Sequence, residues 1–222
     1  MVKFSSFFSF FAVRYSYRHK QNKQTKMALK LDGSEASMLP ILIEKSNILI
    51  GQTTKHSLYE LAEFSVGRGI ADLFVVKTDN DRLSRRKSSR KQPQTDLRSV
   101  IHCDALNDNV IERSIAIEAK VRDWRKGIKQ AMRYKAFADK SYLAVYDDHI
   151  SKPLEYIDIF KALNIGLIGV SDNGVEIYFE PSDNYIDAKK SYLASERVYS
   201  VIDDTKDSFV VRNQFAPHSV PA

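Results

Sequence analysis

Two short apolar segments of the chain each carry an acidic residue where a buried strand would normally have none. Asp72 lies in Gly69–Val76, and Glu118 lies in Ser114–Val121, where Lys120 follows it by two positions. Side chains two residues apart in a strand point to the same face, about 7 Å apart along the strand. A carboxylate in an apolar strand is costly unless it is paired or binds a metal. Two such acids and a lysine that meet at one place would form a divalent-cation site suited to phosphodiester hydrolysis.

That reaction needs a cation that polarises the phosphate, a water that loses a proton, and neutralisation of the growing negative charge. Asp72 and Glu118 offer the carboxylate oxygens that Mg²⁺ prefers, and the backbone carbonyl of Ala119 offers another oxygen. Lys120 beside them can orient the water or help to deprotonate it. We therefore predict Mg²⁺ as the cofactor, with Mn²⁺ as a substitute.

The composition is that of an ordinary globular protein with a basic excess. The 222 residues are 43% hydrophobic and 28% charged, and the net charge is +6. This is enough for one domain with a core, and it is compatible with a nucleic-acid partner. The single cysteine, Cys103, excludes an internal disulfide and a cysteine-rich zinc site. No apolar run is long enough to cross a bilayer, so we expect a cytoplasmic protein without stable membrane insertion.

The first residues of the chain differ in character from the rest. Residues 4–13 are rich in aromatic side chains, and basic residues follow them up to position 26. A secretory signal would place its charge before the apolar segment and end in small residues. We interpret residues 1–33 as a poorly ordered basic and aromatic extension, with a membrane-surface anchor over residues 1–26 as the alternative.

Hydrophobic periodicity and turn residues predict one α/β domain over residues 34–181, in which a mixed central β-sheet is flanked by helices. A first helix is expected within 34–45, with Ser37 as its cap, and the clearest helix spans 123–139, capped by Asp123. Residues 182–222 are expected to form a C-terminal extension. Strands are predicted at 47–53 (or a helix-to-strand link), 56–64 (ambiguous with a helix), 70–77, 114–121, 141–146, 165–170 and 175–179, and further helices at 153–163 and 188–197.

Residues 78–98 interrupt the pattern of strands and helices. They are rich in Lys and Arg, with Ser, Gln, Asp and Pro93 between them. Because no core can be built from such residues, we predict a flexible basic loop. This loop is either a solvated surface segment or an arm that lies on a phosphate backbone.

The helix predicted over 123–139 combines two features that bear on function. Gln130 and Tyr134 are one turn apart and share a face. Basic residues also recur at steps of three and four and form one stripe, which begins two residues after Lys120: Arg122, Lys126, Lys129 and Arg133. The stripe is either a surface for DNA phosphates or an ordinary solvated face. Trp124 is expected to pack in the core rather than to stack on a base.

Taken in order, these motifs resemble the PD-(D/E)xK nuclease superfamily, which contains restriction enzymes, recombination nucleases and Holliday-junction resolvases. The resemblance covers about half of the chain and rests on Asp72 after the turn that begins at Gly67, on Glu118 and Lys120, and on the helix that follows. Ala71 replaces the proline that gives the motif its name. Two other Asp-x-Lys strings lie in polar segments, so the ordered set carries the signal rather than the string.

This resemblance implies a restriction endonuclease-like core and a Mg²⁺-dependent nuclease that hydrolyses phosphodiester bonds of DNA. It implies metal ligation by Asp72 and Glu118 and catalysis by Lys120. Gln130 and Tyr134 are similar to a Gln-x-x-x-Tyr element of recombination exonucleases, which implies that they support the site and the bound DNA. Cutting both strands of a duplex would favour a homodimer.

Members of the superfamily often place a further metal-binding acid on the first helix. Glu44 is the nearest match to that acid, and Glu60 and Glu63 are competitors. The alternative function is a non-catalytic nucleic-acid-binding protein that retains the nuclease-like fold. A missing third carboxylate would favour this alternative, whereas intact buried acids argue against it.

Overall fold

The computed structural model describes residues 31–51, 56–89 and 109–204. Within them the strands are β1 (His56–Val66), β2 (Gly69–Asp79), β3 (Ile111–Lys120), β4 (Lys140–Tyr146), β5 (Gly166–Ser171) and β6 (Gly174–Phe179). The helices are α1 (Glu35–Ile50), α2 (Asn80–Ser89), α3 (Trp124–Tyr134), α4 (Ser151–Glu155), α5 (Ile157–Leu163) and α6 (Ala188–Asp204), and a short 3₁₀ turn spans Asp147–His149.

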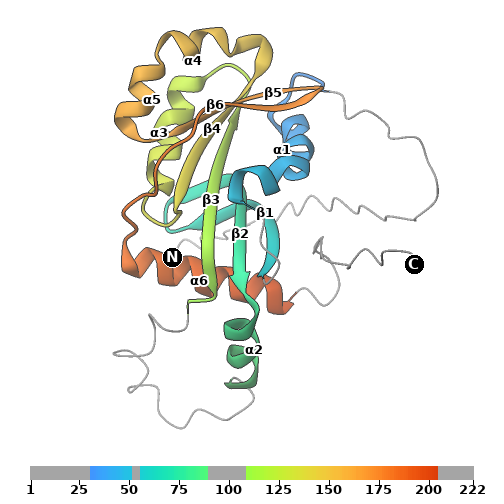
Figure 1. Cartoon of the computed structure of the whole chain (residues 1–222), viewed down its shortest axis with the longest axis vertical. Coiled ribbons are helices and arrows are strands. Elements are labelled where there is room, and N and C mark those ends of the chain that lie inside the picture. The colour runs from blue at the N-terminus through green and yellow to red at the C-terminus, as the bar shows by residue number, and fades with distance from the viewer. Residues whose placement is uncertain (1–30, 52–55, 90–108, 205–222) are drawn as a thin grey trace, which may run out of the picture.

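All the strands belong to one mixed sheet, whose spatial order is the same as the chain order (Figure 1). Strands β1, β2 and β3 pair antiparallel, β4 and β5 continue the sheet in parallel with β3, and β6 returns antiparallel to β5. The predicted α/β architecture, a mixed central sheet flanked by helices, is confirmed.

The sheet is covered on both faces, and each face has its own apolar core. On one face α1 packs against alternate residues of the central strands, including Leu73, Val75 and Ile117. On the other face α3, α5 and α6 pack against the intervening residues, including Phe74 and Val76. Figure 1 shows α1 and α3 on opposite sides of the sheet. Because strand side chains alternate between faces, a strand buried on both faces needs the continuous apolar run that β2 has.

Helix α1 starts earlier and ends later than predicted. Ser34 rather than Ser37 is the cap, because Ser34 Oγ accepts a hydrogen bond from the Ser37 N–H at 3.2 Å. Pro40 consequently lies inside the helix and not in its first turn. The helix includes residues 47–50, where a strand or link was predicted, and ends where Gly51 adopts a φ of +80°. The sequence was ambiguous here because a short apolar run suits a buried helix as well as a buried strand.

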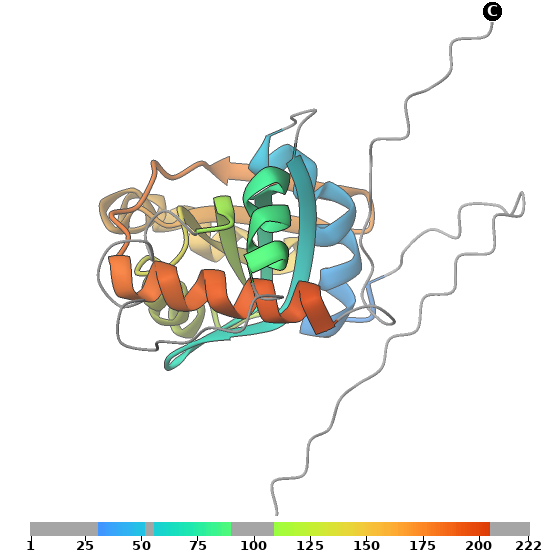
Figure 2. The same cartoon turned by 90° about the horizontal axis from the view of Figure 1, so that it is seen from below.

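The prediction of a flexible loop over 78–98 was wrong for the first half of that range, which forms α2. Asp79 Oδ1 accepts two backbone N–H groups of the first turn of this helix, at 2.9 and 3.1 Å. Arg86 forms an ion pair with Glu196 of α6, and its guanidinium carbon lies 4.5 Å from the centre of the Tyr199 ring. Figure 2 shows α2 beside α6 at one end of the sheet. The helix therefore depends on a distant partner that local composition does not reveal.

The end of the described chain is also part of the domain. The helix predicted at 188–197 extends to Asp204, and Ala194 and Val198 on it are buried in the core shared with α3. The predicted C-terminal extension over 182–222 therefore contains a helix that packs on the sheet. The helix predicted at 153–163 is divided into α4 and α5 at Tyr156.

The remaining strands and the hairpin between β5 and β6 agree with prediction, with Ser171 opposite Gly174 at the turn. Several predictions concern residues outside the described ranges: the N-terminal extension up to residue 30, Cys103, residues 90–98 of the basic loop and residues 205–222. Among the described helices, none combines the length and the apolar character that a membrane span requires.

Candidate active site

The centre of the candidate site is the place where β2 and β3 stop pairing. The antiparallel ladder runs as far as Leu73 opposite Ile117, and the next positions are Asp72 and Glu118. In place of a main-chain bond, the Asp72 carboxylate accepts the backbone N–H of Ala119 at 2.8 Å from its Oδ2. The two acids predicted from the sequence therefore meet across neighbouring strands, and Glu118 faces α3, where Tyr134 contacts it.

Lys120 brings the charged groups of the site together. Its Nζ lies 2.8 Å from Glu118 Oε1 and 3.8 Å from Asp72 Oδ2, and it donates a hydrogen bond to the Ala119 carbonyl at 2.8 Å. Glu118 is completely buried and Lys120 is only 6% exposed. A buried carboxylate of this kind is stable only beside a cation, and the Lys120 ammonium is that cation here.

A third carboxylate reaches the same ammonium from α1, on the other side of the sheet. Glu35, the first residue of that helix, places Oε2 3.1 Å from Lys120 Nζ. Glu44, the acid predicted for this place, lies further along α1, where it is exposed and pairs with its neighbour Lys45, and the structure does not bring it to Lys120. The sequence signal for Glu35 was the cap at Ser34, which places Glu35 in the first helical turn.

The two competing acids lie on β1 and do not join the ammonium. Glu60 accepts a hydrogen bond from the hydroxyl of Ser46 at 2.8 Å. Glu63 is exposed, has a φ of +50° and lies where the pairing of β1 with β2 is interrupted, between the pairs Ala62–Leu73 and Phe64–Ala71. Its negative charge contributes to the environment of Asp72 without touching Lys120.

Helix α3 closes the site through Tyr134. Its hydroxyl donates to Glu118 Oε2 and lies equally close to the backbone carbonyl of Ile70. Gly127, about two turns before it, lets α3 approach the sheet, because a side chain there would collide with Leu143 and come within 2.9 Å of Lys120 Cγ. Tyr134 was predictable from the sequence, whereas Gly127 was not, because its role depends on what packs against it.

Burial and neighbouring charges shift the pKa values of the site. Burial raises the pKa of Asp72, although the Ala119 N–H and Lys120 oppose this effect. Burial likewise raises the pKa of Glu118 against the opposing influence of Lys120 and Tyr134. For Lys120, burial by itself lowers the pKa, but the adjacent carboxylates outweigh it and raise the pKa above its usual value. Lys120 is therefore an ammonium ion at neutral pH in the metal-free protein.

The donor atoms are of the type that a hard divalent cation binds. Three carboxylates and the Ala119 carbonyl place oxygen atoms around one point, and oxygen is the ligand type that Mg²⁺ takes. Within the described residues, no group of three or more His, Cys, Asp or Glu side chains is already arranged to hold a metal ion. The Lys120 ammonium stands among the carboxylates, so a cation would have to share them with it.

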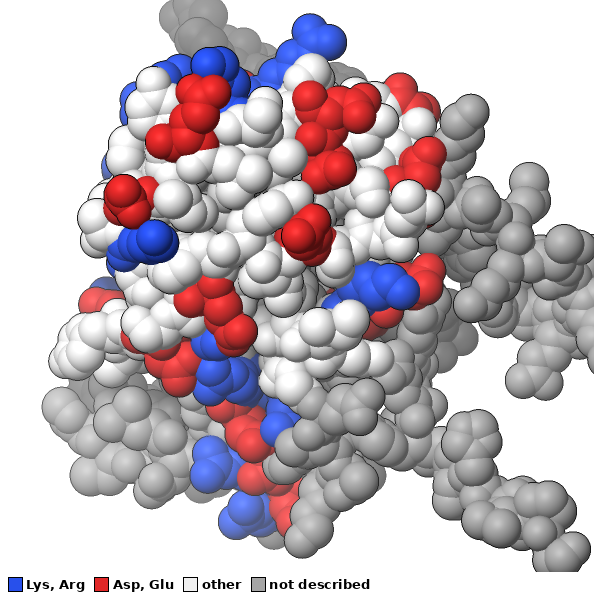
Figure 3. All heavy atoms as spheres, turned by 45° about the horizontal axis from the view of Figure 1, so that its top comes forward, with Lys and Arg blue, Asp and Glu red and all other residues white. Residues whose placement is uncertain are grey.

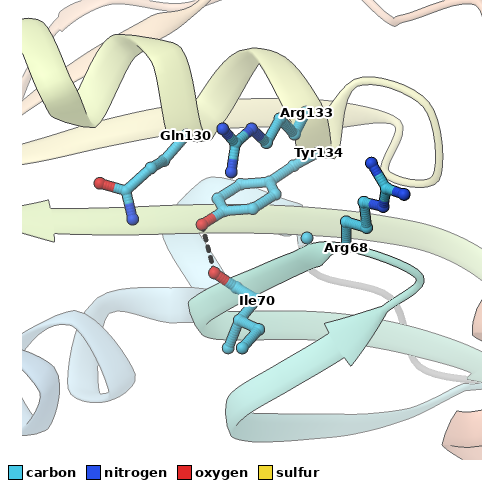
Figure 4. Close-up of a pocket in the computed structure, with 6 residues that line it drawn as sticks. Arg68, Ile70, Gln130, Arg133 and Tyr134 are labelled. Atoms are coloured by element: carbon cyan, nitrogen blue, oxygen red, sulfur yellow. Dashed lines mark hydrogen bonds between the residues drawn. The ribbon is translucent and has the colours of Figure 1, made fainter.

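Beside this charged centre, α3 and the turn between β1 and β2 enclose a small pocket of about 140 Å³ (Figure 4). It is lined by Arg68, Gly69, Ile70, Gln130, Arg133 and Tyr134. Within the described residues, Gln130 forms no hydrogen bond to the charged centre, and its buried Oε1 has no partner. Gln130, which was predicted to support the catalytic site, lies on the wall of this pocket.

The basic stripe predicted on α3 is exposed along its whole length, from Arg122 through Lys126 and Lys129 to Arg133. Arg122 donates a hydrogen bond to His149 Nε2 at 3.1 Å. Trp124 is buried, as expected, and packs beside Phe160. Figure 3 shows a different distribution on the face at the top of Figure 1, where acidic and basic side chains are interspersed among uncharged ones. Whether the stripe contacts DNA stays a prediction.

Comparison with known proteins gives no family assignment. No protein-family model matches the chain, and no curated protein matches it. Among solved structures it is similar to the SPO1766 protein of unknown function from Silicibacter pomeroyi, with 13% identity and a TM-score of 0.36. That match covers 69% of this chain and 85% of the other. So distant a likeness carries no argument about function.

Proposed function

We propose that this protein is a Mg²⁺-dependent nuclease with a restriction endonuclease-like core, which hydrolyses phosphodiester bonds of DNA. The observation that carries the proposal is the meeting of Glu35, Asp72 and Glu118 around Lys120 where β2 and β3 separate. Buried acids held by one lysine are expensive to keep for structure alone, because an apolar replacement of similar shape is often as stable or more so.

The carboxylates and the Ala119 carbonyl would hold the cation, which supplies polarisation of the phosphate and a water of lowered pKa. Glu118 is fixed in place by Tyr134, and Asp72 is fixed by the Ala119 N–H. Both acids are therefore oriented before substrate arrives, which favours a defined geometry.

The charge state of Lys120 restricts its part in the reaction. While its pKa is raised, Lys120 is protonated and can only donate, so it would orient the water and offset negative charge on the phosphate. It could accept a proton only after the carboxylates beside it had been neutralised. In both cases its position next to Glu118 directs the end of the Lys120 side chain at the proposed cation site.

The decisive experiment is cleavage of labelled linear, circular and single-stranded DNA with Mg²⁺ and with EDTA. Glu118→Gln retains hydrogen-bonding groups at the position and should reduce the Mg²⁺-dependent rate by roughly 10²-fold or more. Glu35→Gln tests the acid of α1, and Glu44→Gln on the same helix is its matched control, expected to leave the rate unchanged. Cleavage that persists in Glu118→Gln would contradict the assignment of the site.

The same experiment addresses the alternative function. DNA binding by the wild-type protein without cleavage in Mg²⁺ or Mn²⁺ would support a non-catalytic nucleic-acid-binding protein. The presence of a third carboxylate, Glu35, weighs against that alternative, because it completes the set of acids whose absence would have favoured it.

A further inference from the structure

The pocket beside the charged centre has two walls that belong to different parts of the chain. Arg68 comes from the turn between β1 and β2, and Arg133 comes from α3. The walls approach closely because Gly69 has no side chain: a Cβ there would lie 3.3 Å from Phe137 Cε1 and 3.5 Å from Tyr134 Cδ1. The pocket is therefore a product of tertiary packing, and Figure 4 shows the residues that form it.

The charge of this pocket is positive and available. Arg68 and Arg133 are both exposed, and within the described residues neither has an acidic partner. Other arginines of the described chain are engaged, such as Arg113, whose guanidinium pairs with Asp183. Guanidinium groups bind phosphate oxygens by paired, charge-assisted hydrogen bonds.

The size of the pocket suits a phosphate group. Ile70 turns its backbone carbonyl toward Tyr134, and its exposed side chain points away from α3 (Figure 4). About 140 Å³ accommodates a group several times larger than one water molecule. A phosphate group held by Arg68 and Arg133 suits both the size and the positive charge of the pocket.

The pocket adjoins the charged centre through a shared residue. Tyr134 lines the pocket, and its hydroxyl contacts both Glu118 Oε2 and the carbonyl of Ile70. We propose that this pocket is a phosphate subsite, in which Arg68 and Arg133 hold the phosphate group of a nucleotide neighbouring the one that is hydrolysed. The role of the neighbouring nucleotide rests on the proposed nuclease function, whereas phosphate binding in the pocket does not.

Binding in EDTA tests the subsite independently of cleavage. The probe is a fluorescent oligonucleotide, the readout is anisotropy of the full chain across a salt series, and the variants are Arg68→Ala and Arg133→Ala. Each should raise the Kd roughly tenfold at low salt. Each should also reduce the slope of log Kd against log salt by about 0.7–0.9, as expected when one phosphate contact is lost.

The matched control is Arg197→Ala, which removes the same charge from an exposed position on α6 that does not line the pocket. It should leave both the Kd and the salt slope close to the wild-type values. If all three variants behave alike, or if the wild-type chain does not bind the probe, the subsite is refuted. Failure to cleave DNA in Mg²⁺ would refute the nuclease proposal and leave the binding result in place.

The source of the phosphate is resolved by repeating the titration with oligonucleotides that carry, or lack, a phosphate at each end. If Arg68→Ala loses more affinity for oligonucleotides with a phosphorylated end, the pocket binds a terminal phosphate. The protein would then prefer the ends of DNA. An equal loss for all probes assigns it to a phosphate within the backbone. Both results support the subsite and distinguish its two sources.

Discussion

Replacing Lys120 by methionine should destabilise the metal-free protein much more than neutralising Glu118. Methionine keeps an unbranched side chain of similar reach but removes the ammonium. Three carboxylates would then face one another without their counter-ion. In the wild type, Lys120 Nζ lies 2.8 Å from Glu118, 3.1 Å from Glu35 and 3.8 Å from Asp72. Glu118→Gln instead leaves the ammonium with two carboxylates and removes a repulsion from Asp72.

The expected losses in the free energy of unfolding follow from the burial of the Lys120–Glu118 ion pair. Two unit charges at this range interact by about 4 kcal/mol at an effective dielectric constant of about 20. Loss of one partner of a buried ion pair costs about 3–5 kcal/mol, because the other charge stays buried. We therefore expect Lys120→Met to lower the free energy of unfolding by about 3–5 kcal/mol. Glu118→Gln should cost only about 1–2 kcal/mol, the scale of a hydrogen bond to a charged group.

The assay is urea unfolding followed by circular dichroism at pH 7 in EDTA, with the double variant Lys120→Met/Glu118→Gln included. If the two residues compensate each other, the double variant should be more stable than Lys120→Met alone. A loss below about 1 kcal/mol in Lys120→Met, or a double variant as unstable as the sum of the single variants, would refute the reasoning. Lys120 would then not be the counter-ion of the buried acids.

Three further predictions concern the packing, the hydrogen bonds and the protonation of the site. Gly127→Ala should cost about 1–3 kcal/mol by crowding Leu143, and calorimetry against the wild type measures this loss. Tyr134→Phe should cost about 1–3 kcal/mol, since it leaves Glu118 Oε2 buried without its donor; a wild-type melting temperature would contradict this. The raised pKa values of Asp72 and Glu118 mean that the folded, metal-free protein binds more protons than the unfolded chain above the ordinary values of 3.8 and 4.5. Its stability should therefore fall as pH rises through that window up to the raised values, and Mn²⁺ affinity measured by calorimetry should weaken as pH falls through the same window.

The local sequence pattern was sufficient to predict the part of the site that lies within a single strand or helix. Glu118 and Lys120 are two residues apart in a strand, so their shared face follows from backbone geometry, and the structure places them 2.8 Å apart. The Asp123 cap and the buried stripe of α3 were predictable for the same reason. The meeting of Asp72 with Glu118 needed one further assumption, that β2 and β3 are neighbours.

Contacts between elements distant in sequence could not be predicted in this way. Helix α2 was taken for a loop because its own residues are polar, and the ion pair of Arg86 with Glu196 that accompanies it joins residues 110 positions apart. Likewise, nothing near Arg68 in the sequence connects it with Arg133. Each segment has a local helix or strand propensity, but that propensity does not determine which surface the element packs against.

The sequence by itself determined that two acids and a lysine lie in apolar strands, where their burial demands a partner or a cation. Only the tertiary structure decided which acid of α1 completes the set. Glu35 reaches Lys120 because α1 packs its apolar face on the sheet, which brings the start of the helix to the place where β2 and β3 separate. Side-chain spacing along a strand is fixed by covalent geometry, whereas the distance between a helix and a strand is fixed only when their faces are buried together.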